Sequence, residues 1–191
     1  MSKQILIISD THCHFDVMAQ IIDFERKRNP EISVLLHCGD LGVYDSRILT
    51  RLPTKEQRLI AKHKNPVHLF LPYLSGQQKF PLAVYGIPGN HEDFELIEGL
   101  IAGSQQVENL FMIDQGRTIT CEIAGKKLQI MGLGKILPDG SEKILPKKIQ
   151  ENDIAIARRN GRKMTIDVLL LHDPPLIKTE NGRIFGSTVL R

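Results

Sequence analysis

The sequence predicts an α/β fold with a mainly parallel sheet, helices beside it and a second, antiparallel sheet. Four short apolar runs have the composition of strands buried on both faces, and they cover residues 4–8, 32–36, 82–87 and 167–171. Stretches long enough for crossover connections lie between these runs. Near residue 125, apolar and polar residues alternate on both sides of a Gly-Lys pair, which is the pattern of a β-hairpin.

The first crossover is predicted to be a helix that Asp16 caps and that ends before Pro30. Its apolar face is expected to consist of Val17, Met18, Ile21, Ile22 and Phe24. Further helices are predicted at Lys55–Lys64, Asp93–Leu100 and Ile149–Arg159, and one and a half helical turns at Ile184–Leu190. Further strands are predicted at Leu110–Ile113, Ile119–Ala124 and Lys127–Gly132, and Asp167–Leu171 is assigned to the parallel set.

Residues 41–81 form a connection that is too long for a simple crossover, so a functional or partly helical segment is expected there. An aromatic, turn-prone stretch within it includes Phe70 and Tyr73. The densest basic run of the chain also lies in it, with Arg47, Arg51, Lys55, Arg58, Lys62, His63, Lys64 and Lys79. Such side chains could hold a nucleic-acid backbone and stack a base. The more general interpretation is a solvated helix face and a loop packed by its own aromatics.

Polar clusters follow the four apolar runs directly. They are Ser9-Asp10-Thr11-His12, His37-Cys38-Gly39-Asp40, Gly89-Asn90-His91-Glu92 and His172-Asp173. In open α/β sheets, ligands bind beyond the carboxyl ends of the strands, so all four clusters are expected to meet at one edge. For the third cluster alone, an ordinary Pro-Gly-Asn turn before a helix capped by Glu92 and Asp93 is an equal alternative.

These clusters predict a centre with two divalent metal ions that hydrolyses phosphate esters. Asp40 is expected to bridge the ions, with Asp10 and His12 on one ion and Asn90 and His172 on the other. His91 is expected to donate a proton to the leaving oxygen or to hold a phosphate oxygen, which makes it the catalytic residue. Imidazole together with carboxylate favours manganese first, with iron, zinc or cobalt as alternatives to magnesium or calcium.

The composition is that of a globular protein with one domain spanning residues 1–191. Hydrophobic residues make up 41% and charged residues 25%, and the net charge of +3 is compatible with a phosphate-bearing partner, such as a nucleotide or RNA. The sequence shows no leader and no membrane-spanning run, so a cytoplasmic location is expected. Three cysteines without CxxC spacing predict reduced thiols. The oligomeric state is left open.

The residues Asp10-x-His12, Gly39-Asp40, Gly89-Asn90-His91-Glu92 and His172 resemble, in order and strand context, the calcineurin-like metallophosphoesterase superfamily. This resemblance implies a sandwich of two mixed sheets flanked by helices, with a dinuclear metal centre at the sheet edge. It also implies that Asp10, His12, Asp40, Asn90 and His172 are metal ligands, and that Asn90 and His91 contact the substrate.

The sequence departs from this family at its end. The family continues to a Gly-His-x-His motif on a further strand, and this sequence reaches Leu190-Arg191 without it. The expectation is therefore a domain truncated at the C-terminus, with its last strand missing. Water, His14 or a partner chain could complete the ligand sets, or the chain has lost activity. A site that lacks ligands is expected to bind metal more weakly.

The long connection resembles the insertion of RNA lariat debranching enzymes. The stretch Tyr73-Leu74-Ser75-Gly76, followed by Pro81 and then by Gly89-Asn90-His91-Glu92, carries this resemblance. Those enzymes have Cys in place of the first Asp, and Asp10 departs from that pattern. The resemblance implies a branched or 2′,5′-linked RNA phosphodiester as a substrate hypothesis.

The sequence thus predicts a metal-dependent phosphoesterase that acts on diesters in preference to monoesters. The alternative is a non-catalytic binding protein that has kept the fold. A Rossmann-like nucleotide binder is disfavoured, because no GxGxxG motif follows the first strand.

Overall fold

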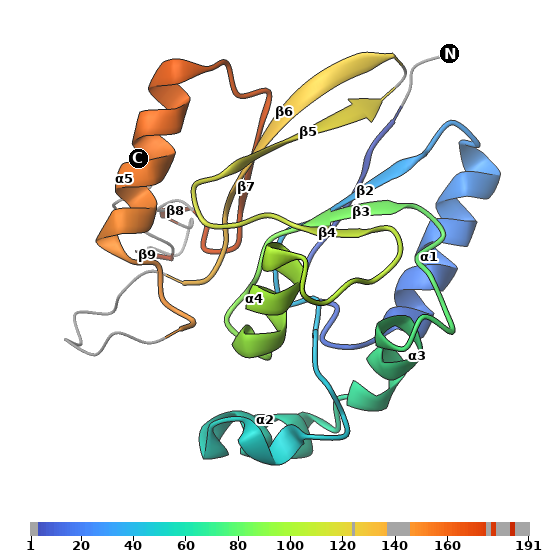
Figure 1. The fold of residues 1–191 in the computed structure, drawn as a ribbon. Coiled ribbons are helices and arrows are strands. Elements are labelled where there is room, and N and C mark those ends of the chain that lie inside the picture. Colours follow the sequence, from blue (N-terminus) through green and yellow to red (C-terminus); the bar gives the residue numbers. More distant parts are fainter. Residues whose placement is uncertain (1–3, 124, 137–145, 175–176, 179–183, 186–191) are drawn as a thin grey trace.

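The four-stranded sheet in the centre of the molecule is parallel throughout. The computed structural model describes residues 4–123, 125–136, 146–174, 177–178 and 184–185. Strands β1 (Leu6–Ile8), β2 (Val34–His37), β3 (Ala83–Gly86) and β4 (Leu110–Met112) lie in this sheet in chain order. All three neighbouring pairs are parallel (Figure 1). The predicted parallel sheet is confirmed.

The second sheet contains the predicted hairpin and one strand that the sequence pattern predicts in the parallel sheet. β5 (Thr118–Ile123) pairs antiparallel with β6 (Lys126–Leu133), and β6 pairs parallel with β7 (Val168–Leu171). The assignment of β7 to the first sheet was therefore wrong, and β4 is the fourth strand there. A short apolar run predicts a buried strand but does not specify which sheet contains it.

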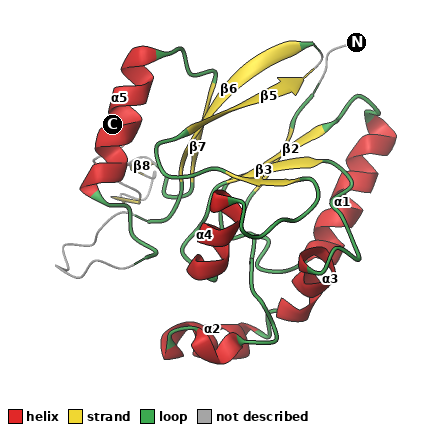
Figure 2. Cartoon of the chain, in the orientation of Figure 1, coloured by secondary structure: helices red, strands yellow, loops and turns green. Residues whose placement is uncertain are grey.

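Helices cover the outer face of the parallel sheet (Figure 1). They are α1 (Phe15–Arg28), the short α3 (Leu71–Leu74) and α4 (Phe94–Ala102). Helix α2 (Thr54–His63) lies farther from the sheet (Figure 1). The long connection also contains 3₁₀ turns at η1 (Leu49–Arg51) and η2 (Val67–Phe70). Helix α5 (Glu151–Lys163) lies against the second sheet, where Ala157 packs near Met131 and Leu133. Figure 2 shows the helices on both outer sides of the paired sheets.

The cores explain the layered arrangement. Along β2, Leu35 points into the core beneath the helices, whereas Val34 and Leu36 point into the core between the two sheets. Ile130 of β6 and Leu170 of β7 cover that second core from the other side. A strand with apolar residues on both faces can pack against two layers at once. The result is the predicted sandwich of two sheets flanked by helices.

Helix α1 differs from its prediction in two ways. It begins at Phe15, so Asp16 lies in its first turn, where a negative charge favours the helix dipole, and not at the cap. Only Met18 and Ile22 of the predicted apolar face are buried, together with Phe15. Val17, Ile21 and Phe24 are exposed. One stripe of the helix, about a third of its circumference, is enough to cover the sheet.

The aromatic stretch of the long connection belongs to the core. Phe70 and Phe80 are fully buried, and the Tyr73 and Phe80 rings stack with their centroids 4.5 Å apart. Phe15 of α1 packs against the same rings. The interpretation as a loop packed by its own aromatics is confirmed, and base stacking by Tyr73 or Phe70 is excluded by burial. The predicted basic helix is present as α2.

The last predicted element was wrong where it can be compared. Ile184–Phe185 form the short strand β9, which pairs antiparallel with β8 (Ile177–Lys178), and not a helical turn. The rest of the predicted helical segment, residues 186–190, lies outside the described residues. Asp93 caps α4 as predicted, because its side chain accepts a hydrogen bond from the Leu96 N–H.

Candidate metal centre

The polar clusters meet at the carboxyl ends of parallel strands, as predicted. Asp10 follows β1 and Asp40 follows β2, while Asn90 follows β3 and His172 follows β7 of the second sheet. Two backbone hydrogen bonds join the first two loops, from Asp10 N to Gly39 O at 3.0 Å and from His12 N to Asp40 O at 2.9 Å. These bonds fix the two loops relative to one another beside the sheet edge.

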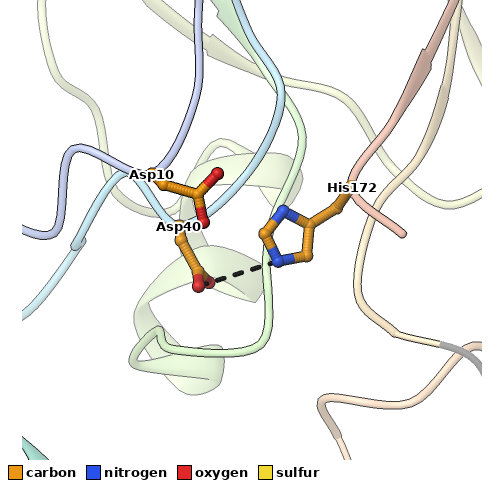
Figure 3. A group of neighbouring side chains, drawn as sticks. All are labelled: Asp10, Asp40 and His172. Atoms are coloured by element: carbon orange, nitrogen blue, oxygen red, sulfur yellow. Dashed lines mark ion pairs between the residues drawn. The ribbon is translucent and has the colours of Figure 1, made fainter. Parts of the chain in front are cut away.

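Asp40 lies at the middle of the site and is buried. Its Oδ1 accepts a hydrogen bond from the His91 backbone N–H at 2.7 Å. Its Oδ2 lies 3.8 Å from His12 Nε2. The same oxygen lies 3.6 Å from His172 Nε2 (Figure 3). One carboxylate oxygen therefore lies near the imidazoles of both His12 and His172.

His172 directs its Nε2 at the centre. Its Nδ1 lies 2.9 Å from the Cys38 carbonyl oxygen, which can only accept, so Nδ1 is the donor. In the neutral ring, Nε2 then has a lone pair, and it faces Asn90 Oδ1 at 3.0 Å as well as Asp40 Oδ2. Lone pairs that converge in this way repel one another unless a cation lies between them.

The donor set fits a divalent metal ion. Ligand atoms of Asp10, Asp40 and His172 all lie within 4.8 Å of one another (Figure 3). His12 Nε2 is also 3.8 Å from Asp10 Oδ1. Mixed carboxylate and imidazole ligands suit first-row transition metals. The structure thus brings together the five predicted ligands, Asp10, His12, Asp40, Asn90 and His172.

The loops that carry these ligands have strained backbones. Asp10, His12 and Asp40 have φ angles of 56°, 44° and 53°, a left-handed region that few non-glycine residues adopt. Such conformations persist where the surrounding structure holds them, and they concentrate at functional sites. Three of the five predicted ligands, Asp10, His12 and Asp40, therefore lie on strained backbone.

Two glycines leave room for the ligands. A Cβ atom on Gly39, which has a φ of 101°, would lie 2.4 Å from His172 Nδ1. A Cβ on Gly89 would lie 2.0 Å from Asp40 Oδ1. Either distance is below any van der Waals contact, so these positions require glycine for the ligands to stay in place.

Glu92 holds the loop that follows Asp40. Its buried carboxylate accepts backbone N–H bonds from Leu41 at 2.9 Å, Gly42 at 3.1 Å and Val43 at 2.6 Å. Burial and the nearby Asp40 charge raise the pKa of Glu92, and the three N–H donors oppose that rise. The predicted helix-capping role of Glu92 is replaced by this role in the loop.

His91 is held by a residue that the sequence reasoning missed. Its Nδ1 lies 3.2 Å and 3.3 Å from the two carboxylate oxygens of Glu56, and Tyr44 donates its hydroxyl hydrogen to Glu56 Oε1 at 2.7 Å. The hydrogen bond with Glu56 raises the pKa of His91, Asp40 adds to the rise, and burial opposes it. Glu56 lies in the long connection, where no motif distinguishes it from other charged residues.

A cavity of about 570 Å³ opens beside the centre. Its lining includes Glu56, Leu59 and His63 of α2 together with Asp10, His12, Asp40, Asn90 and His91. His14 also lies on its wall, but it belongs to neither the metal cluster nor the ion pairs of the described residues. The cavity can thus admit a ligand to both His91 and the carboxylates.

His37, Cys13 and Cys38 contribute to the structure around the site. Burial lowers the pKa of His37 to about 3, so the ring is neutral, and its Nε2 lies 3.1 Å from the Thr11 hydroxyl. That hydroxyl donates to the Leu41 carbonyl, so the contact fixes the first loop. Cys38 contacts His172 through its backbone carbonyl, and Cys13 is a buried thiol in the core.

Comparison with known proteins identifies the class. The family model for calcineurin-like phosphoesterases matches residues 3–191, so the chain belongs to this family. Membership supports a metal-dependent phosphoesterase, a hydrolase of phosphate esters, as the general class. A comparison with curated proteins found no match. None of the helices in the described part of the chain is both long and apolar enough to cross a membrane.

Proposed function

We propose that the chain hydrolyses phosphodiesters with the help of two divalent metal ions. The observation that carries this proposal is Asp40 Oδ2, which lies between His12 Nε2 and His172 Nε2. Asp10, His12 and Asp40 would hold one ion, and Asp40, Asn90 and His172 the other. We propose manganese as the first candidate and iron, zinc or cobalt as alternatives, because the ligands combine carboxylate with imidazole.

Two bound ions would supply Lewis-acid stabilisation of the phosphoryl oxygens and would lower the pKa of the attacking water. The residues of the chain supply the remaining steps. The oxygen of water bonds to phosphorus and its proton passes to solvent, while the P–O bond to the leaving group breaks and protonated His91 gives its Nε2 proton to the leaving oxygen. Asn90 and His91 contact the substrate phosphate. The hydrogen bond with Glu56 raises the pKa of His91, which favours the protonated form of the ring that this step needs.

Branched or 2′,5′-linked RNA is the substrate that we propose for testing first. The resemblance of the long connection to the insertion of lariat debranching enzymes supports it. So does the charge on α2, where Lys55, Arg58 and Lys62 recur at helical spacing beside the residues that line the cavity. These three side chains are exposed and form no ion pair with other described residues. A phosphate backbone beside the cavity would pair with them.

The test measures metal content and hydrolysis of bis(4-nitrophenyl) phosphate with added Mn²⁺, Co²⁺, Zn²⁺ or Mg²⁺. We expect about two ions per chain and metal-dependent turnover, and we expect Asp40→Asn to reduce turnover by at least about 100-fold. Asp23→Asn, an exposed substitution on α1, is the matched control and should behave as the wild type. Absence of both tight metal binding and turnover would instead favour a non-catalytic binding protein.

A further inference from the structure

The two ring nitrogens of His91 have different surroundings. Nδ1 contacts both oxygens of the Glu56 carboxylate, at 3.2 Å and 3.3 Å, whereas the ring forms part of the cavity wall. A carboxylate can only accept, so in the neutral ring Nδ1 carries the hydrogen and donates it to Glu56. Nε2 is therefore the nitrogen that remains for a ligand in the cavity.

The Glu56 carboxylate is itself held in place. The buried Tyr44 donates its hydroxyl hydrogen to Glu56 Oε1 at 2.7 Å, and the Glu56 side chain is only 12% exposed. Water thus competes little for the carboxylate oxygens. Helix α2 is docked through buried Ile60 and through Gln57 Nε2, which donates to the Leu52 carbonyl at 2.7 Å. Packing therefore holds α2 in place, and hydrogen bonds hold the Glu56 carboxylate between Tyr44 and the His91 ring.

We infer that Glu56 is a positioning residue, whose carboxylate sets the orientation and tautomer of His91 so that Nε2 faces the substrate phosphate. The inference rests on the proposed function and deepens it, because it assigns a second residue to the protonation of the leaving oxygen. A ring that is oriented before reaction needs no ordering during it. Helix α2 therefore completes the site as well as covering it.

A purely structural role makes different predictions. If Glu56 only docks α2 through Tyr44, then Glu56→Ala and Tyr44→Phe should have similar effects, since each breaks the same hydrogen bond. If Glu56 positions His91, Tyr44→Phe keeps the Glu56–His91 contact and Glu56→Ala removes it. Glu56→Gln keeps a side-chain oxygen that can accept from Nδ1, so it is the conservative variant.

The first measurement is the ¹⁵N NMR spectrum of histidine-labelled protein at a pH where the His91 ring is neutral, with His91→Ala used for assignment. We expect the Nδ1–H tautomer in the wild type, in Glu56→Gln and in Tyr44→Phe. We expect Glu56→Ala to lose it and to show Nε2–H or exchange between the two tautomers. An unchanged His91 spectrum in a folded Glu56→Ala protein would overturn the inference.

The second measurement compares two diesters in the presence of Mn²⁺. One expels 4-nitrophenolate, which leaves without a proton, and the other is a dinucleotide that expels a sugar hydroxyl and needs one. We expect Glu56→Ala to lower kcat about 10- to 100-fold for the dinucleotide, to leave KM unchanged, and to change kcat less than about threefold for the aryl diester. We expect Glu56→Gln to lower kcat for the dinucleotide less than Glu56→Ala does. Glu122→Ala, an exposed control on β5, should have the kcat of the wild type.

The double variant Glu56→Ala/His91→Ala completes the design. We expect it to be no slower than His91→Ala alone, because both changes act through one ring. Equal losses on the two diesters, or additive losses in the double variant, would overturn the inference. If the wild type hydrolyses neither diester, the proposed function fails, and the NMR spectra still decide whether Glu56 sets the ring of His91.

Discussion

At the scale of single residues, the centre depends on how closely two loops approach each other. Asp40 has its Oδ1 bonded to the His91 N–H and its Oδ2 directed at two imidazoles, so neither oxygen can move without loss of a contact. The space for this carboxylate exists because residue 89 has no side chain. A methyl group added at residue 89 therefore tests whether the position of the Asp40 carboxylate matters for metal binding.

Gly89→Ala should weaken metal binding, and it should also lower stability, because the added Cβ would lie 2.2 Å from the Asp40 backbone N. The added Cβ would overlap Asp40 Oδ1, which is 2.0 Å from the ideal position, and would push the carboxylate out of its place between the imidazoles. We expect the Kd for Mn²⁺ to rise at least about tenfold by isothermal titration calorimetry, an effect of the size seen for disturbed ligand orientation. Gly161→Ala, where no atom lies within 4 Å of the new Cβ, is the matched control. Equal affinity in both variants would contradict the geometry.

Glu92→Ala should reduce stability strongly. Three buried backbone N–H groups, of Leu41, Gly42 and Val43, would lose their acceptor, and each unpaired buried donor costs about 1–3 kcal/mol. We expect the free energy of unfolding in urea to fall by about 3 kcal/mol or more. Glu98→Ala, an exposed substitution on α4, should change it by less than about 0.5 kcal/mol. A loss below about 1 kcal/mol for Glu92→Ala would mean that water replaces the carboxylate.

At the scale of elements, the sequence predicted the strand ends of the site better than the connections between strands. Apolar runs such as Val34–Leu36 predict buried strands, and the candidate ligands that follow them reach one edge because parallel strands point the same way. Glu56 could not be found in this way. Its contact with His91 depends on how residues 41–81 fold back over the sheet, which tertiary packing decides and local periodicity does not.

Helix α2 also allows a test of the RNA proposal. Lys55→Gln/Arg58→Gln/Lys62→Gln removes three exposed charges beside the cavity. We expect weaker binding of single-stranded RNA and a slope of log K against log salt that is smaller by about 2, because each phosphate contact contributes roughly 0.7. The control is Arg158→Gln/Arg159→Gln/Arg162→Gln on α5, which removes the same charge elsewhere. Equal effects of the two triple variants, measured by fluorescence anisotropy, would indicate binding by net charge alone.

At the scale of the whole molecule, the candidate ligands come from both sheets. Asp10, Asp40 and Asn90 follow strands of the first sheet, and His172 follows β7 of the second. Sequence patterns predicted that both sheets exist and that His172 belongs to the site. They did not predict that β7 pairs with β6, because an apolar run fits either sheet and only the register Ile130 to Val168 settles the choice.

Metal binding should therefore stabilise the whole fold. An ion held by ligands from both sheets binds the native state and not the separated chain, so at 100 times its Kd it adds about 2.7 kcal/mol. We expect Mn²⁺ to raise the midpoint of thermal unfolding by roughly 5–10 °C for a chain of this length. The rise should be reversed by EDTA and be absent in Asp40→Asn. A shift of the same size in that variant would place the stabilising ion elsewhere.

Because His172 follows a strand of the second sheet, its distance from Asp40 depends on how the two sheets pack together. Val34, Ile130 and Leu170 form the core that sets how far β7 lies from the first sheet, and none of them belongs to the metal cluster. A change in their volume would alter the separation of His172 from Asp40 while leaving every ligand in the sequence. Variation among apolar residues of this core could therefore tune the affinity for metal, although no polar group is exchanged.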